Sequence, residues 1–277
     1  MPPLPSPETS GEPISEEETL GRLRQRDDVS QRYYAAWWLG LTRTKNPEGL
    51  SLLLDALSAA LHPEASPDDL LVARNAARAL GKLCNQEAAV PLSQALQHPD
   101  HALREAAARA LGELGNPELL PELLHQLMQP DAAKPSSDGL HLQQPCEALL
   151  EAIGCLARGT RDAELCRKLE PFSGHERLLV QSSACRALLQ ISEAGQWGER
   201  ILPLLNHPEP LIRRGALLDL GASGWRPAAE AIAGCAAESS LKLLALRTLL
   251  ESPLGLPAPA ALGPSEQELL ALMDRLL

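Results

Sequence analysis

Aromatic residues are nearly absent from this sequence, which has four Trp, two Tyr and one Phe among 277 residues. β-Branched residues are also scarce, and no stretch alternates between apolar and polar residues with the period of two that a half-buried strand requires. Leu and Ala supply most of the 44% hydrophobic content, and both residues favour helices. The sequence therefore predicts an all-α protein.

Three further absences exclude other classes of protein. Basic residues are not in excess, since the net charge is −11, and this argues against general binding of nucleic acid. No apolar run approaches the ~18 residues that would cross a membrane, so no membrane insertion is expected. The first residues, MPPLPSPETSGEPISEEE, have neither the basic region nor the apolar region of a secretory signal.

Cysteine pairs of the C-x-x-C type are absent as well. The six cysteines are Cys84, Cys146, Cys155, Cys166, Cys185 and Cys235. Most of them fall inside helical patterns, so we expect small core residues of a reduced, cytoplasmic protein. The histidines are scattered, and no spacing indicates a metal site or a catalytic triad.

What the sequence does contain is a repeated pattern that ends in Ala-Leu-Gly. Its clearest copies are LVARNAARALGKL and ALREAAARALGEL, whose glycines Gly81 and Gly112 are 31 residues apart. An earlier copy, RYYAAWWLG, ends at Gly40, and weaker copies continue to about residue 250. A second amphipathic segment follows the clear copies, and a period of roughly 30 to 40 residues indicates stacked helix pairs. We predict a HEAT-like helical-repeat solenoid, an α-α superhelix of about six to seven helix pairs.

The pattern also suggests how the helices pack and where the repeats stop. Small residues on one face let neighbouring helices approach closely, and we expect each glycine to end its helix in the left-handed conformation. We divide the chain into a disordered tail at 1–15, the solenoid at 16–251, and a Pro/Gly linker with a short C-terminal helix at 252–277. The long segment 130–145 is either a functional loop or a tolerated insertion.

Candidate binding residues come from the first helix of each pair, which we expect to line the concave surface. They are Tyr33, Tyr34, Trp37, Trp38, Arg74, Asn75, Arg78, Glu105 and Arg109. Four of the seven aromatic residues fall between Tyr33 and Trp38. Consecutive residues of a helix point about 100° apart, so these four rings cannot all face one core. At least one or two of them should therefore reach the groove.

Two interpretations of these residues remain open. The rings could form a stacking platform for a flat conjugated ligand, with the arginines binding its carboxylates. Alternatively, the rings cover the open end of the core, and the arginines form ion pairs between repeats with Glu105 and Glu151.

The stretches RYYAAWWLG at 32–40 and ARNAARALGKL at 73–83 resemble the E-type subunit of the phycobilin lyases of cyanobacteria and red algae. The resemblance implies a two-subunit enzyme that needs a related F-type HEAT-repeat subunit. Such an enzyme attaches a linear tetrapyrrole, typically phycocyanobilin, through a thioether bond to a cysteine of the phycocyanin alpha subunit. The pigment is then a transferred substrate, and neither a permanently bound cofactor nor a metal is expected.

The resemblance implies that the nine candidate residues bind the bilin. Carboxylates that would face the pyrrole nitrogens are Asp27, Asp28 and Glu105, and the sequence identifies no catalytic acid or base. Two alternatives stay open: a non-catalytic scaffold or chaperone for phycobiliprotein subunits, and a lyase or isomerase that acts on another bilin.

Overall fold

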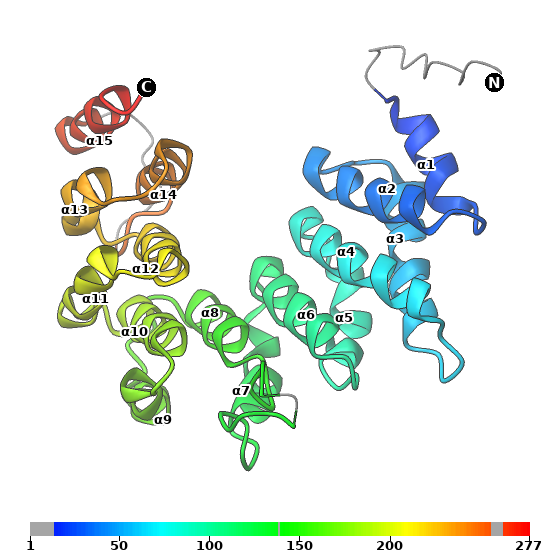
Figure 1. The fold of residues 1–277 in the computed structure, drawn as a ribbon, viewed down its shortest axis with the longest axis horizontal. Helices are drawn as coiled ribbons and strands as arrows, with labels where there is room; N and C mark the ends of the chain where they lie inside the picture. Colours follow the sequence, from blue (N-terminus) through cyan, green and yellow to red (C-terminus); the bar gives the residue numbers. More distant parts are fainter. Residues whose placement is uncertain (1–13, 138, 256–262) are drawn as a thin grey trace, which may run out of the picture.

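The computed structural model describes residues 14–137, 139–255 and 263–277. Within these ranges the chain forms fifteen α-helices and no strand beyond an isolated bridge between Pro135 and Leu142. The helices stack into an open arch (Figure 1). The predicted all-α solenoid is therefore confirmed, whereas most of the predicted tail at 1–15 lies outside the described residues.

Two layers of helices make up the arch, and one layer lines its concave side (Figure 1). The inner helices are α2 (Val29–Thr42), α4 (Pro67–Leu83), α6 (His101–Leu114), α8 (Cys146–Leu156), α10 (Leu178–Ser192), α12 (Pro210–Ser223) and α14 (Ser239–Glu251). The outer helices are α3 (Pro47–Ala60), α5 (Ala89–Ala95), α7 (Leu120–Leu127), α9 (Ala163–Leu169), α11 (Gln196–Ile201) and α13 (Ala229–Gly234). Helices α1 (Glu16–Arg24) and α15 (Pro264–Asp274) lie at the two ends.

Local sequence signals set the limits of these helices, as α4 illustrates. Ser66 is the N-cap of α4, and its side chain and that of Asp69 form a reciprocal capping box, with Pro67 at the first position of the helix. The helix ends where Cys84 adopts a left-handed conformation with φ of 52°. Between these ends, a stripe of Ala and Leu side chains is buried against the neighbouring helices.

The glycines of the repeat pattern lie inside the inner helices and not at their ends, so our prediction of a left-handed terminal glycine was wrong. Each glycine instead faces an alanine of the next inner helix. The pairs are Gly40–Ala79, Gly81–Ala110, Gly112–Ala152, Gly154–Ala187 and Gly221–Ala245. A Cβ atom added at any of these glycines would lie only 2.7 to 2.8 Å from the Cα atom of the facing alanine. Glycine is therefore needed for close approach of the helices, and Arg43, Cys84 and Gly115 take the left-handed positions after α2, α4 and α6.

At the C-terminal end, α15 packs against α13 and α14, where Leu269 and Leu272 are buried. Arg226 donates hydrogen bonds to Ser265 and Glu266 and so attaches α15 to the last repeat. None of the described helices is both long and apolar enough to cross a membrane.

The cysteines divide into two groups, because the prediction of core positions holds for only some of them. All six are free thiols: Cys146, Cys185 and Cys235 are buried, Cys166 is half-buried, and Cys84 and Cys155 are exposed. Burial raises the pKa of Cys146 to about 12, so this thiol stays protonated at neutral pH. Cys84 and Cys155 correct the prediction, since Cys84 is exposed at the C-cap of α4 and Cys155 is exposed on α8.

Candidate functional site

The aromatic segment occupies α2 and turns two of its rings to solvent. Tyr34 is 63% exposed and Trp37 is 48% exposed, whereas Tyr33 and Trp38 are half-buried and Trp38 packs against the core. The rings of Tyr33 and Tyr34 meet edge to face, with centroids 5.6 Å apart. Tyr34, Trp37 and Leu41 are spaced three and four residues apart, and therefore form one exposed apolar stripe along the helix. The expectation that the four rings do not all face one core is confirmed.

Trp37 belongs to a row of equivalent positions along the concave side. These positions are equivalent because of their spacing from the glycine–alanine contacts between inner helices. Each lies either three residues before the glycine of such a contact or one residue before the alanine of such a contact. The row consists of Trp37, Arg78, Arg109, Glu151, Arg186, Leu218 and Leu244. None of these side chains is fully buried. The concave row thus changes along the arch from aromatic to charged and then to aliphatic.

Arg74 does not belong to this row, and its guanidinium is already paired. Its Nε and Nη2 atoms donate to Oδ1 and Oδ2 of Asp100 at 3.0 and 2.6 Å. Asp100 is also the N-cap of α6, where its Oδ1 accepts a hydrogen bond from the backbone N–H of Leu103. Burial alone would raise the pKa of Asp100, but Arg74 and the Leu103 N–H hold it below its usual value. The pair therefore fixes α4 to the start of α6.

Asn75 is buried and connects α2 to α4. Its Nδ2 donates to the backbone carbonyl of Tyr33 at 3.1 Å, and its Oδ1 accepts a hydrogen bond from Nη1 of Arg78 at 3.0 Å. Arg78 is exposed, and within the described ranges its guanidinium has no carboxylate partner. Asn75 therefore orients a cation that is free to bind an anion one helix away from Trp37.

The middle of the row is a ladder of ion pairs across α6, α8, α10 and α12. Nη2 of Arg109 lies 3.3 Å from Oε1 of Glu105 and 3.4 Å from Oε1 of Glu151. Nη1 of Arg186 lies 3.8 Å from Oε2 of Glu151 and 3.4 Å from Oδ1 of Asp219. The Arg109–Glu151 pair thus joins two repeats, as the alternative interpretation of the arginines predicted, whereas the Arg109–Glu105 pair lies within α6.

Asp219 is the deepest carboxylate of this ladder. Its Oδ2 accepts a hydrogen bond from Oγ of Ser182 at 2.6 Å, and both side chains are buried. Burial raises the pKa of Asp219 to about 6; the neighbouring Glu151 adds to this effect, whereas Arg186 and Ser182 oppose it. The concave side therefore contains a buried carboxyl group whose pKa lies well above that of an ordinary aspartate.

Asp27 and Asp28 lie away from the row, in the turn before α2. Oδ1 of Asp28 accepts a hydrogen bond from the backbone N–H of Gln31 at 3.0 Å, which makes Asp28 the N-cap of α2. Among the described residues, no group of three or more His, Cys, Asp or Glu side chains is arranged to hold a metal ion.

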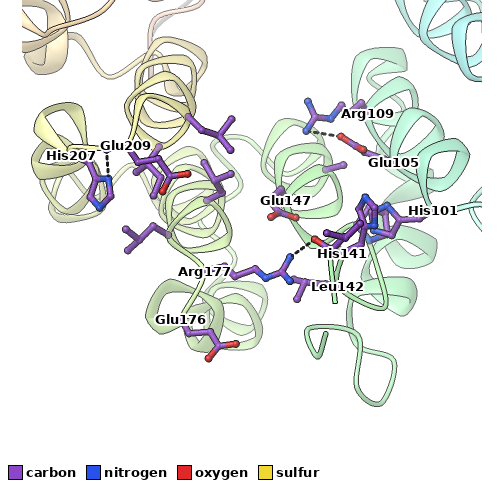
Figure 2. A pocket seen from close by; sticks show the side chains of 17 residues that line it. His101, Glu105, Arg109, His141, Leu142, Glu147, Glu176, Arg177, His207 and Glu209 are labelled. Carbon is purple, nitrogen blue, oxygen red and sulfur yellow. Dashed lines mark hydrogen bonds and ion pairs between the residues drawn. The ribbon is translucent and has the colours of Figure 1, made fainter. Parts of the chain in front are cut away.

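Two adjoining hollows in the concave side share Arg109, Glu147, Leu179 and Leu211, and we call them together the central trough. The larger hollow has a volume of about 710 Å³, and the smaller one, toward α14, about 470 Å³. Figure 2 shows the larger hollow, with Glu105 and Arg109 on one side and His207 and Glu209 on the other. Of the nine predicted residues, Glu105 and Arg109 line the trough; the other seven line neither hollow.

The segment between α7 and α8 forms one wall of the larger hollow. It folds back on itself through hydrogen bonds from the Ser136 N–H to the His141 carbonyl and from the Gln143 N–H to the Lys134 carbonyl, at 2.9 and 2.8 Å. Leu140, His141 and Leu142 of this segment line the hollow. The length of this loop could have pointed to the trough, but the sequence left open whether the segment is a functional loop or a tolerated insertion. The lining leucines of α10 and α12 gave no signal, because they resemble core residues of the repeat.

Comparisons with known proteins agree with this architecture. A family model of HEAT repeats matches residues 58–134, and a model described as the PBS lyase HEAT-like repeat matches residues 31–59. In the solved complex of CpcE and CpcF of phycocyanin lyase from a Nostoc species, one chain superimposes with a TM-score of 0.81 and 38% sequence identity, and the match covers 100% of both chains.

Curated relatives match over nearly the whole chain. The bilin biosynthesis protein RpcE of a Synechococcus species is 48% identical over 250 residues, which are 89% of this chain and 93% of the relative. The phycocyanobilin lyase subunit alpha of a Picosynechococcus species is 41% identical over 263 residues, which are 94% and 96% of the two chains. Identity of this extent shows common ancestry along the entire solenoid, and the chain belongs to the phycocyanobilin lyase subunit alpha family of HEAT-repeat proteins.

Proposed function

We propose that this chain is one subunit of a bilin lyase that works together with an F-type subunit. The enzyme attaches a linear tetrapyrrole, phycocyanobilin in the first instance, to a cysteine of the phycocyanin alpha subunit. The full-length match to a chain of the CpcE–CpcF complex carries the proposal, because it includes both repeat architecture and sequence. The pigment is a substrate that the enzyme transfers, not a resident cofactor. The six free thiols agree with a reduced compartment, which for this function is the cytoplasm.

The reaction adds the thiol of the acceptor across the exocyclic C=C bond of the bilin. Sulfur bonds to the outer carbon, and the proton lost by the thiol is balanced by a proton gained at the ring carbon, so no oxidant or reductant is needed. A thiol with a pKa of about 8.5 must become a thiolate to add. Holding a flexible pigment in one conformer against that thiol supplies much of the rate increase.

The exposed face of α2 is the part of the concave side that best suits a conjugated ring. Tyr34 and Trp37 present their rings to solvent, and on the next helix Arg78 offers a guanidinium that donates to Asn75 but has no carboxylate partner among the described residues. From Trp37 to Arg109 is two inner-helix spacings, or about 16–20 Å, a length that an extended four-ring chain can span. We therefore place the pigment along the row from Trp37 through Arg78 to Arg109. Arg74 and Asn75 hold the helices beneath it in register.

The function can be tested by co-producing the chain with an F-type subunit, the apo phycocyanin alpha subunit and a source of phycocyanobilin. We expect a covalent adduct that fluoresces with zinc in a denaturing gel, and no adduct when this chain is omitted. A non-catalytic scaffold would bind the apo subunit but leave it without pigment. That result would contradict the proposed activity.

Trp37 and its neighbour Trp38 form a matched pair for testing the platform. Trp37→Ala is expected to weaken binding of free phycocyanobilin about 5- to 150-fold, because stacking on one ring contributes about 1–3 kcal/mol. Its thermal unfolding should change little, since the ring is 48% exposed. Absorbance titration and circular dichroism give the two quantities.

Trp38→Ala should do the reverse. Its ring packs against the core, so removing it is expected to destabilise the fold by about 1–3 kcal/mol while bilin affinity changes less than in the Trp37 variant. If Trp37→Ala destabilises the fold as much as Trp38→Ala and leaves bilin affinity unchanged, both rings only cover the end of the core.

A further inference from the structure

The central trough is bordered by leucines that the core does not cover. Leu211 of α12 is 57% exposed and Leu244 of α14 is 50% exposed, and both line the smaller hollow together with half-buried Leu179 and Leu218. In the sequence pattern such positions resemble core residues, but here they face the concave space. A gathering of exposed aliphatic side chains around a hollow is typical of a surface that binds a partner.

The arginines around the trough differ in what they already bind. Arg109 and Arg186 are each held between two carboxylates, and Arg177 and Arg213 donate to backbone carbonyls. Arg214 is exposed, lines the smaller hollow, and within the described ranges has neither a hydrogen bond nor an ion pair. Its guanidinium is therefore available for a carboxylate that a partner brings.

No Trp, Tyr or Phe side chain is among the described residues that line the trough, so it suits a conjugated pigment less well than the exposed rings of Tyr34 and Trp37 do. A protein segment with apolar side chains and one acidic residue matches this surface better. The trough also lies on the concave side, which a segment can enter from solvent.

The position of the trough next to the proposed pigment row narrows the choice of segment. The pigment placed along the row from Trp37 ends at Arg109, and both Arg109 and Glu105 also line the larger hollow. Thiol addition requires the sulfur and the attacked carbon to approach to about 3–3.5 Å. The segment that carries the thiol must therefore occupy the space next to the end of the pigment, and the trough is that space.

We propose that the central trough receives the thiol-bearing segment of the acceptor protein. Apolar side chains of that segment pack on Leu179, Leu211 and Leu244, and a carboxylate of the segment pairs with Arg214. The proposal rests on the proposed function, since it takes the pigment to lie along the row that starts at Trp37.

The test measures two affinities of the complex with the F-type subunit: one for the apo phycocyanin alpha subunit without pigment, and one for free phycocyanobilin without acceptor. Leu211→Ser and Arg214→Glu are each expected to weaken acceptor binding at least about tenfold, as truncation of a central interface residue does. Bilin affinity should stay within about twofold of the wild-type value. Trp37→Ala should show the opposite result, with weakened bilin binding and normal acceptor binding.

Val90→Ser serves as the matched control, because Val90 is 68% exposed on outer helix α5 and should affect neither affinity. Normal acceptor binding by both trough variants would overturn the proposal. If the trough variants lost bilin affinity, the trough would be the pigment site, and the proposal would be wrong. If they no longer bound the F-type subunit, the trough would be the interface between the subunits, and the proposal would also be wrong. A wild-type complex that forms no adduct at all would instead contradict the proposed function.

Discussion

Gly81→Ala is expected to destabilise the chain, although alanine normally favours a helix over glycine by about 1 kcal/mol. The reason is the contact between α4 and α6, where the new Cβ atom would lie 2.7 Å from Cα of Ala110 and 2.9 Å from its Cβ. Neither atom can move without shifting the backbone of α6. Overpacking of this kind typically costs about 1–3 kcal/mol, and thermal unfolding followed by circular dichroism measures it.

Gly21→Ala provides the same chemical change without the contact. Gly21 lies inside α1, and a Cβ atom added there meets nothing within 4 Å. We expect this variant to be stabilised by up to about 1 kcal/mol through helix propensity alone. Opposite signs for the two substitutions are the expected outcome. A Gly81→Ala variant as stable as Gly21→Ala would show that the close contacts between inner helices do not limit the packing of the arch.

The free energy of unfolding of the wild-type chain is expected to decrease, relative to that of the Asp219→Asn variant, as the pH rises from about 4 to about 6. The ordinary pKa of an aspartate is 3.8, and the pKa of Asp219 in the folded chain is about 6, mainly because of burial. Between these values the folded state binds more protons than the unfolded state, so the free energy of unfolding decreases with rising pH. A gap of about two pKa units corresponds to a change on the order of 3 kcal/mol.

The groups that face Asp219 are Glu151, Arg186 and Ser182, and the substitution leaves all three in place. Asp100→Asn is the matched control. The pKa of Asp100 is lowered by Arg74 and the Leu103 N–H, so its contribution to stability is present above about pH 3.8 and is lost as the pH falls from 3.8 toward the lower pKa of the folded state. Denaturant unfolding of both variants between about pH 4.5 and pH 7 should therefore give a difference from wild type that changes with pH for Asp219→Asn and stays nearly constant for Asp100→Asn. A flat difference for Asp219→Asn would mean that Asp219 ionises at its ordinary pKa.

The repeat was readable from the sequence because it is a local pattern. Ala and Leu spaced along one helix face, with proline and capping residues between the helices, predict helix pairs without any knowledge of their neighbours. The role of glycine was not readable in the same way. Gly81 lies close to the end of α4, and a terminal glycine and a contact glycine look alike until the facing Ala110 is known.

In the candidate site, too, one part was predictable from the sequence and another part was not. The cluster from Tyr33 to Trp38 was evident, because such a concentration of rings in a chain with seven aromatic residues is conspicuous. The angle between consecutive helical positions was enough to predict that some rings leave the core. The partners of the arginines were not predictable, since Arg74 and Asp100 are 26 residues apart and meet only when two repeats stack.

By itself, the sequence determined the helical repeats, the aromatic face of α2 and, through its likeness to known proteins, the family. Tertiary structure alone decided which charges are already paired, that Asp219 is buried beside Arg186, and that a trough opens between the loop before α8 and helix α14. The physical reason is the separation along the sequence over which each property is determined. Helix formation and amphipathic faces depend on residues within a few positions of one another, whereas pairing, burial and concavity depend on the curvature that stacking gives to residues tens of positions apart.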